Sequence, residues 1–132
     1  MNIEMTFLME PVSKGRPRVM RTKGGKSITY TPTKTAMAEN LIRAEVVGCR
    51  ESFPKDVPLH MTAIFYRTRP KHLKKSVLYP TTRPDLDNYF KLLIDALQGF
   101  LFIDDSQIVS MNTAKLFGSP PRIELEITEV QD

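Results

Sequence analysis

The sequence predicts an α+β fold, a small mixed β-sheet of about four main strands plus a basic hairpin, packed with two main helices. Apolar residues alternate with polar ones in some segments, as in strands, and recur every three or four residues in others, as in helices. The two kinds of segment are mixed along the chain without an internal repeat. With 132 residues, 41% of them hydrophobic, the chain is expected to form a single domain over residues 1–132.

Four segments carry strand patterns. Residues 2–9 alternate cleanly, and residues 59–67 are apolar at nearly every position, which indicates a central strand. Two closing strands are expected over residues 107–116 and 122–128, and the alternation of the second leaves one of its faces in water.

Two segments carry helix patterns. The first helix is expected over residues 33–49, and the second from about residue 87 to residue 98, where Gly99 is a typical helix end. The apolar stripe expected on the first helix consists of Ala38, Leu41, Ile42, Val46 and Cys49.

Charge is unevenly distributed along the chain. Residues 1–84 hold 16 Lys and Arg against 6 Asp and Glu, a balance of +10, and residues 85–132 hold 3 against 9, a balance of −6. The two add up to the net charge of +4. Such a division fits a protein that binds a polyanion and has a separate acidic site, although basic residues that only solubilise one face would give the same composition.

The basic charge is concentrated in two segments without acidic residues. In residues 11–38, short strand patterns at 18–20 and 28–30 flank Gly24-Gly25 and predict a basic hairpin. Residues 68–84 contain three prolines and are expected to form a long exposed loop, a kind of segment that is often functional.

The composition also bears on the compartment. The single cysteine, Cys49, cannot form an internal disulfide, which suits a reducing compartment. No apolar run approaches the ~20 residues of a membrane helix, and the N-terminus has no signal-peptide pattern. We therefore expect a cytoplasmic protein, associated with the nucleoid when bound to DNA, and no membrane partner.

Carboxylates cluster in two short motifs, Pro84-Asp85-Leu86-Asp87-Asn88 and Asp104-Asp105-Ser106-Gln107. In an extended segment Asp85 and Asp87 project from the same side, just before the second helix. That helix advances roughly 18 Å at ~1.5 Å per residue, and about six extended residues after Gly99 return roughly 20 Å at ~3.3 Å each. This match in length predicts that Asp104 and Asp105 come back beside Asp85 and Asp87.

Three or four carboxylates at one point repel one another unless a cation is bound. Oxygen ligands without His or Cys favour Mg²⁺, or Mn²⁺, over zinc. Lys91 follows Asp87 by one helical turn and could offset charge at a phosphodiester. Each feature alone also has a structural explanation, because the aspartates could be cap and turn residues and Lys91 could pair with Asp87 or Asp95. Their combination, directly after a basic loop, favours a metal site.

Several segments, taken together and in order, are similar to one known family. They are Lys14-Gly15-Arg16-Pro17-Arg18, Thr29-Tyr30-Thr31-Pro32, Arg83 to Asn88, Lys91, Asp95 to Gly99 and Asp104 to Ile108. The chain resembles the RusA family of Holliday junction resolvases. The resemblance implies a RusA-like fold and a homodimeric, Mg²⁺- or Mn²⁺-dependent endonuclease without an organic cofactor. Its expected substrate is a four-way junction or other branched DNA, in which two opposed strands are nicked symmetrically.

The resemblance also implies roles for individual residues. Asp85, Asp87 and Asp105 would bind the metal and act in catalysis, with Asp104 as a further candidate ligand and Lys91 as a lysine important for activity. Contacts to DNA phosphates are expected from Lys14, Arg16, Arg18, Arg21, Lys23, Lys26, Arg67, Arg69, Lys71, Lys74, Lys75, Arg83 and Lys115.

The match with the family departs at Gln98 and Ile103, which lie in the turn that leads to Asp105. Two other functions stay open from the sequence. The chain could be a non-catalytic nucleic-acid-binding module with structural aspartates, or a metal-dependent nuclease that acts on RNA or flapped DNA. The first alternative predicts salt-sensitive binding without cleavage, and a panel of substrates would separate the second.

Overall fold

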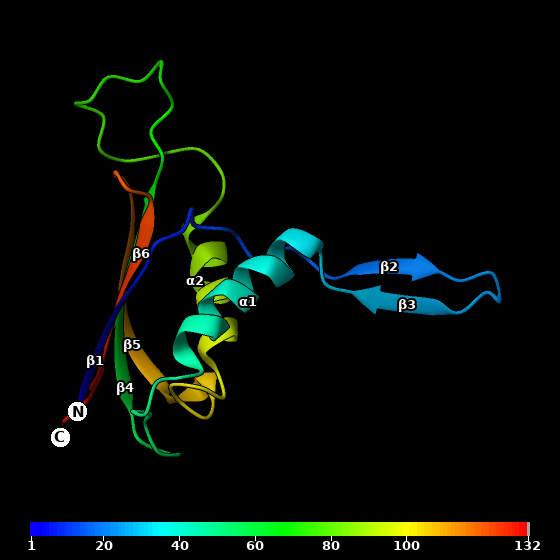
Figure 1. The fold of residues 1–132 in the computed structure, drawn as a ribbon, viewed down its shortest axis with the longest axis horizontal. Helices are drawn as coiled ribbons and strands as arrows, with labels where there is room; N and C mark the ends of the chain where they lie inside the picture. Colours follow the sequence, from blue (N-terminus) through cyan, green and yellow to red (C-terminus); the bar gives the residue numbers. More distant parts are fainter. Residues whose placement is uncertain (132) are drawn as a thin grey trace.

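A computed structural model describes residues 1–131 and confirms the α+β fold (Figure 1). The elements in chain order are β1 (Asn2–Phe7), β2 (Arg18–Arg21), β3 (Ser27–Tyr30), α1 (Thr33–Val46), β4 (Leu59–Arg67), α2 (Leu86–Leu97), a short 3₁₀ helix (Asp105–Gln107), β5 (Ile108–Phe117) and β6 (Arg122–Glu129). All of them were expected except the 3₁₀ helix, and α1 ends at Val46, before the predicted residue 49.

The main sheet has the strand order β1-β6-β4-β5. β6 runs antiparallel to both β1 and β4, whereas β4 and β5 are parallel. β4 therefore lies inside the sheet, as its nearly continuous apolar sequence predicted. Parallel neighbours require a long crossover connection, and here that connection consists of the basic loop and α2. The crossover is the part of the fold that positions the candidate site.

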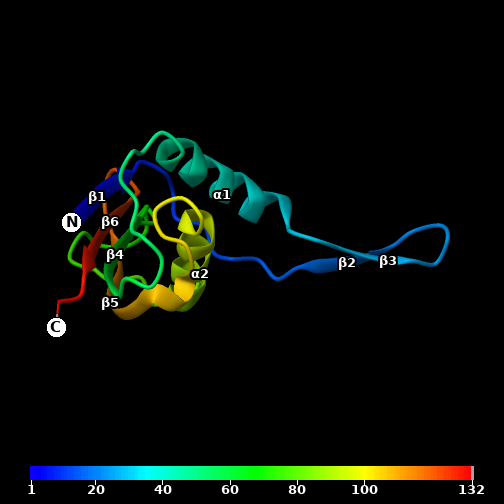
Figure 2. The ribbon, with the colours of Figure 1, turned by 90° about the horizontal axis from the view of Figure 1, so that it is seen from below.

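One face of the sheet is covered by α1 and α2, and the other face is open (Figure 2). The side chains that point toward the helices form the core, and those of the strands are Ile3, Phe7, Leu59, Met61, Ala63, Phe65, Ile123, Leu125 and Ile127. The alternation along β6 thus leaves one of its faces in water, as predicted. Within residues 1–131, neither α1 nor α2 combines the length and the hydropathy that crossing a membrane requires.

The buried stripe of α1 differs from the predicted one. Leu41 is 58% exposed, whereas Glu39, a charged residue, is only 5% exposed. The cause is the segment around Lys14, which passes along this side of the helix and places the Lys14 ammonium 3.1 Å from the Glu39 carboxylate. A buried charge of this kind is tolerated because it is paired, and periodicity alone could not reveal its partner.

The predicted basic hairpin is present and projects away from the rest of the protein (Figures 1 and 2). β2 and β3 pair antiparallel from Arg18 opposite Tyr30 to Arg21 opposite Ser27. Gly25, at φ +78°, makes the turn in a backbone conformation that favours glycine. Every residue of both strands is exposed, so the hairpin contributes nothing to the core.

Residues 68–85 form the expected long loop without helix or strand. Its start is fixed to the body, because the N–H and hydroxyl of Thr68 donate to the Glu10 carboxylate at 3.0 and 2.7 Å. Farther along, the Arg69 guanidinium donates to the carbonyl oxygen of Val77 at 2.8 Å. The loop is therefore held at Thr68 and by the bond between Arg69 and Val77, and most of the residues between them are exposed to water.

On the open face of the sheet, Glu4 of β1 lies directly opposite Glu126 of β6. The pKa of Glu126 is raised, first because its carboxyl shares a hydrogen bond with Glu4, and then by burial and by the charge of Glu4. Ionised Glu126 therefore destabilises the fold above its raised pKa. We expect Glu126→Gln to increase the free energy of unfolding near neutral pH, with no gain well below pH 4.5, where the carboxyl is protonated in both states.

Urea unfolding of the Glu126→Gln variant at the two pH values measures this effect. Glu51→Gln is the control, because Glu51 is an exposed glutamate outside the sheet. Equal stability of the Glu126→Gln variant and the unmodified protein at neutral pH would contradict cross-strand repulsion.

Candidate active site

Asp85 and Asp87 lie at the N-terminal end of α2. Asp85 is the N-cap, with an extended backbone at φ −73° and ψ 148°, and Asp87 is already in the first helical turn. Asp85 and Asp87 were expected to lie together in an extended segment before the helix. In the structure only Asp85 is extended, and Asp87 is helical. Both side chains are exposed, and the Asp87 carboxylate accepts a hydrogen bond from the Asn88 N–H at 3.0 Å. The free amides and the dipole of this helix end favour the negative charge.

The backbone that leads into α2 is fixed by two basic side chains of the sheet. Arg67, the last residue of β4, donates to the carbonyl oxygens of Thr82 and Arg83 at 3.3 and 3.2 Å. Lys115 of β5 donates to the carbonyl oxygens of Thr82 and Pro84 at 3.0 and 3.1 Å. Both residues were expected to contact DNA, and in the structure they hold the end of the basic loop against the sheet.

A hollow of about 530 Å³ lies beside Asp85. Its lining consists of Ser13, Arg16, Arg83, Pro84, Asp85 and Asn88. Arg16 belongs to the segment that leads to the hairpin, and Arg83 belongs to the basic loop, so the two basic parts of the chain meet here. Guanidinium groups bind phosphate oxygens through pairs of hydrogen bonds, and this hollow therefore suits a phosphate next to a carboxylate.

Lys91 follows Asp87 on α2 by one turn, and its side chain is exposed. The sequence left open an ion pair between Lys91 and Asp87 or Asp95. Among residues 1–131 none of the ion pairs includes Lys91, so neither of these pairs is formed in this structure.

Asp104 and Asp105 form a second acidic group at the start of the 3₁₀ helix. Asp104 caps this helix, because its carboxylate accepts from the Ser106 N–H at 3.1 Å. The Asp105 N–H donates to Oε1 of Gln98 at 3.3 Å. Gln98, one of the two departures from the family pattern, therefore holds Asp105 beside the C-terminal end of α2.

The two neighbouring carboxyls perturb each other's ionisation. The pKa of Asp104 is lowered, first because the Ser106 backbone amide donates to it, and then by its hydrogen bond with Asp105. The pKa of Asp105 is raised, first by the hydrogen bond with Asp104, then by burial, and then by the negative charges of Asp104 and Asp95. The contribution of Asp95 agrees with the position of Asp105 near the second half of α2.

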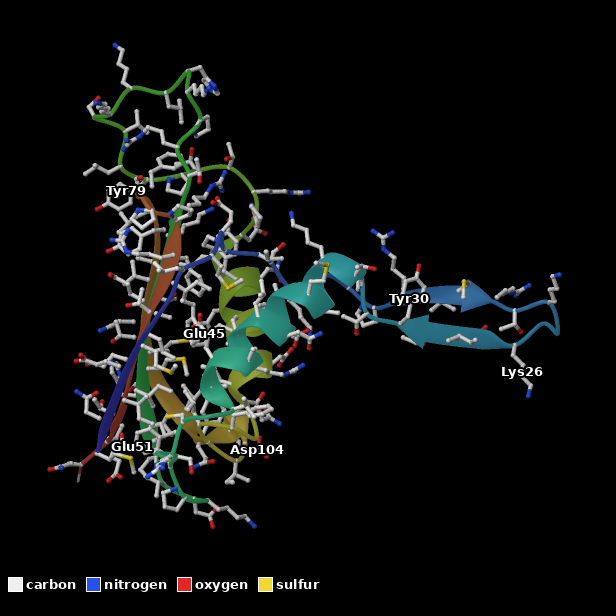
Figure 3. All side chains as sticks on the ribbon, viewed as in Figure 1. Lys26, Tyr30, Glu45, Glu51, Tyr79 and Asp104 are labelled. Atoms are coloured by element: carbon white, nitrogen blue, oxygen red, sulfur yellow. The ribbon has the colours of Figure 1, made fainter. Side chains whose placement is uncertain are left out.

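The prediction that Asp105 returns beside Asp85 and Asp87 is wrong for a single chain. These residues lie at opposite ends of α2, whose twelve residues span about 18 Å at ~1.5 Å each. Figure 3 shows Asp104 at the lower end of the protein, beside the start of β5. Within residues 1–131 no three His, Cys, Asp or Glu side chains are placed to hold one metal ion. The aspartates of one chain do not fit a three-carboxylate metal site.

The chain does not return in an extended form because it turns tightly after α2. The Gly99 N–H donates to the carbonyl oxygen of Phe102 at 2.8 Å, and Leu101 and Phe102 are buried in the core. The chain runs back toward Asp85 along β5 instead. The β5 residue that reaches this end of α2 is Lys115, which donates to the carbonyl oxygen of Pro84. The prediction assumed that Leu101 and Phe102 lie in an extended connection, but their apolar side chains are buried and hold them at the C-terminal end of α2.

Lys14 is neutralised inside the protein. Its ammonium lies 3.1 Å from Glu39 Oε1 and 3.1 Å from Asp95 Oδ2. Burial on its own lowers the pKa of Lys14, but the hydrogen bonds and charges of Asp95 and Glu39 outweigh it and raise the pKa above 10.5. Lys14 therefore connects α1 with α2 rather than standing free for DNA, and Asp95 has a structural role as one of its two partners.

The other basic residues lie on the two basic segments. Those with exposed side chains are Arg16, Arg18, Arg21, Lys23, Lys26, Lys71, Lys74, Lys75 and Arg83. Arg69 is partly buried, with its guanidinium 5.5 Å from the centre of the Phe117 ring. Among nearby aromatic residues, Tyr79 is 62% exposed (Figure 3), whereas Phe65 is buried and stacks on Tyr89. Tyr79 is thus free to stack on a base and Phe65 is not.

Gln107 has a role that the sequence analysis did not assign. Its side chain is buried, and its Oε1 accepts from the N–H groups of Ile103 and Asp104 at 3.0 Å each. Its Nε2 donates to the carbonyl oxygens of Pro54 and Val57 at 2.8 and 3.1 Å. The sequence contains a signal for this role, because Asp104 and Gln107 have the three-residue spacing of a capping box.

The arrangement of charges defines the class of protein. Exposed carboxylates lie beside arginines at the junction of two basic segments, an arrangement that suits the binding of a phosphate chain next to a carboxylate. Such an arrangement is typical of a nuclease, and comparisons with known proteins support this class and specify the kind.

The family model described as endodeoxyribonuclease RusA matches residues 9–128. The chain belongs to this family, which confirms the resemblance seen in the sequence. It is 33% identical to the uncharacterized protein YqaN of Bacillus subtilis (strain 168), over 97% of this chain and 96% of that protein. It is 42% identical to the crossover junction endodeoxyribonuclease rusA of Lactococcus phage r1t, over 61% of this chain and 62% of that protein.

Proposed function

We propose that this protein is a metal-dependent endonuclease that resolves four-way DNA junctions by hydrolysing one phosphodiester in each of two opposed strands. The observation that supports this most is the family match over residues 9–128, together with the phage relative whose name gives crossover junctions as its substrate. The hollow between the two basic segments, beside Asp85, is a suitable place for the scissile phosphate.

Roles for the site residues follow from their positions. Asp85 and Asp87 present two exposed carboxylates at a helix end, and Lys91 presents an ammonium one turn later. In this proposal Lys91 offsets the negative charge that grows on the phosphate during hydrolysis. Arg67 and Lys115 position the carboxylates through the backbone of the loop. Asp105 lies at the other end of α2, so its proposed part in the same reaction, with Asp104 beside it, rests on the family resemblance and not on its position.

The proposed cation is Mg²⁺, with Mn²⁺ as a substitute, because the donor set consists of carboxylate oxygens without His or Cys. When bound, such an ion stabilises negative charge on a phosphodiester. We further propose a homodimer, since one site in each subunit matches the two-fold symmetry of a four-way junction. The protein acts on DNA in the cytoplasm as one domain, and no organic cofactor is needed.

A cleavage assay tests the proposed function. Purified protein is incubated with a labelled four-way junction and, in parallel, with a linear duplex of the same sequence, each with Mg²⁺, with Mn²⁺ and with EDTA. We expect paired nicks in the junction only, and only with a divalent ion. Salt-sensitive binding without cleavage under any of these conditions would instead support a non-catalytic binding module. Cleavage of RNA or flapped DNA in preference to the junction would change the substrate class.

The exposed hairpin leads to a separate prediction for binding. Lys23 and Lys26 lie in the turn between β2 and β3, and the hairpin extends away from the core (Figure 1). If each contacts one phosphate, the double variant Lys23→Gln/Lys26→Gln reduces the slope of log Kd against log salt by about 2. Fluorescence anisotropy with a labelled junction over a range of salt concentrations measures this slope.

The matched control for the hairpin variant is Arg50→Gln/Lys55→Gln, which removes two exposed charges outside both basic segments. We expect the slope of this control to equal that of the unmodified protein. An unchanged slope in the hairpin variant would show that the hairpin does not contact the DNA backbone.

A further inference from the structure

The base of the basic hairpin carries a further inference, which rests on the proposed function. The hairpin leaves the body through residues 13–17, called here the outgoing segment, and the chain returns through Pro32 directly into α1 (Figure 1). Arg16 of the outgoing segment lines the hollow beside Asp85. The contacts that fix this segment therefore fix both the direction of the hairpin and the position of an arginine next to the candidate site.

Two consecutive backbone amides attach the outgoing segment to the two helices. The Lys14 N–H donates to the carbonyl oxygen of Asn88, in the first turn of α2, at 2.9 Å. The Gly15 N–H donates to the hydroxyl oxygen of Thr35, in the first turn of α1, at 2.9 Å. Both bonds lie directly before Arg16, so the backbone that carries this arginine is held from two sides.

Thr35 is a polar residue in a buried position, with only 2% of its surface exposed. Besides accepting from the Gly15 N–H, its hydroxyl donates to the carbonyl oxygen of Ser13 at 3.5 Å. Burying a hydroxyl is unfavourable unless it is hydrogen-bonded, and both bonds of this hydroxyl are made to the outgoing segment. One side chain of α1 thus holds the segment at two positions.

The outgoing segment also packs closely against α1 and the residue before it. A Cβ atom at position 15 would lie 2.8 Å from Thr35 Oγ1 and 2.9 Å from Pro32 Cγ. Such distances are too short for non-bonded atoms, so only glycine permits the two chain segments to approach this closely. The base of the hairpin is therefore fixed by packing as well as by hydrogen bonds.

The side chain of Lys14 reinforces this attachment. Its ammonium bridges Glu39 of α1 and Asp95 of α2, at 3.1 Å from each carboxylate. Ion pairs that are partly buried are screened much less by salt than exposed pairs. Because every residue of β2 and β3 is exposed, the contacts at the base are the ones that orient the hairpin on the body.

We propose that Thr35 is a positioning residue of the nuclease site, whose hydroxyl holds the outgoing segment so that Arg16 contacts the scissile phosphate beside Asp85. Thr35 itself contacts no DNA and acts through Gly15 and Arg16. A guanidinium stabilises charge on a reacting phosphate only if it is in place when that charge develops. A displacement of about 1 Å can reduce a rate by about 100-fold, so loosening this base lowers the rate of nicking.

Thr35→Val tests the proposal, because it keeps the shape of the side chain and removes the hydroxyl. The Gly15 N–H then lacks its acceptor, and the outgoing segment shifts to satisfy it. We expect the single-turnover rate of junction nicking in Mg²⁺ to fall by about 10-fold or more. The Kd for the junction should change by less than about 3-fold, because most phosphate contacts are expected elsewhere on the hairpin and the basic loop. Thr35→Ser keeps the hydroxyl and should nick at the unmodified rate.

The matched control is Thr33→Val, which alters an exposed threonine of the same helical turn. Rates are compared at a temperature where circular dichroism shows every variant to be folded. A purely structural role of Thr35 predicts that the folded Thr35→Val variant nicks at the unmodified rate, and that result overturns the proposal. Equal fold-losses in nicking rate and in junction affinity overturn it as well, since Thr35 would then act on binding.

Gly15→Ala disturbs the same contact from the other side. Its added methyl group forces the outgoing segment away from Thr35 and Pro32, and we expect a similar loss of nicking rate with junction binding retained. Gly24→Ala is the control within the hairpin, because a Cβ atom there has no contact closer than 3.9 Å. A folded Gly15→Ala variant with the unmodified nicking rate contradicts the proposal.

Amide hydrogen exchange, measured by NMR, tests the attachment without any cleavage. We expect the Gly15 N–H to be protected in the unmodified protein and in Thr35→Ser, and to exchange about 10-fold faster in Thr35→Val. If the unmodified protein shows this protection but does not cut junctions, the proposed function fails and the attachment is still supported. Equal exchange of the Gly15 N–H in all three proteins overturns the attachment, whatever the nicking activity.

Discussion

Replacing Asp87 with Asn is expected to reduce the rate of junction nicking by about 100-fold or more, the loss typical of removing one electrostatic group that acts in the transition state. Binding of the junction should persist, because we expect the phosphate contacts to come from the basic hairpin and loop and not from this carboxylate. The side chain is exposed and its hydrogen bond is local. We therefore expect the free energy of unfolding to change by no more than about 0.5 kcal/mol.

The same outcome is expected for Asp85→Asn and Asp105→Asn. Asn is as good an N-cap residue as Asp, so the first of these substitutions leaves α2 intact. Cleavage in Mg²⁺ and anisotropy with the same labelled junction measure activity and binding side by side. Asp56→Asn, which removes an exposed carboxylate outside both acidic groups, should have normal activity. Full activity of any of the three site variants would remove that residue from the proposed machinery.

The fold was predictable because each element has a strong local pattern. The alternation of β6 indicates a strand with one face open to water, and the apolar run of β4 indicates a strand inside the sheet. Glu39 of α1 was not predictable, because its burial depends on Lys14, a residue distant in sequence that pairs with it. Patterns read from one segment contain no information about a partner that another segment supplies.

The candidate site shows the same limit at a larger scale. The two acidic motifs were identified from sequence, and the structure places Asp85 at the start of α2 as expected. The predicted position of Asp105 was wrong because the residues between the end of α2 and Asp104 were assumed to form an extended connection. Leu101 and Phe102 are buried instead, and their burial fixes Asp105 at the far end of the helix. Burying two large apolar side chains stabilises the fold by about 3–6 kcal/mol. The two charged residues that follow have no interaction of this size that would draw the turn elsewhere.

Replacing Gln107 with Leu is expected to lower the free energy of unfolding by about 2–4 kcal/mol, because two N–H groups and two carbonyl oxygens lose their partner in a buried place. The affected groups connect the turn that carries Asp104 with the segment around Pro54 and Val57. Urea unfolding measures the loss, and Gln131→Leu is the matched control, since Gln131 is exposed near the C-terminus. Equal stability of the two variants would show that water replaces the Gln107 side chain. If the turn loosens as expected, Asp105 is no longer held in place, and nicking at a temperature where the variant is folded should fall more than junction binding does.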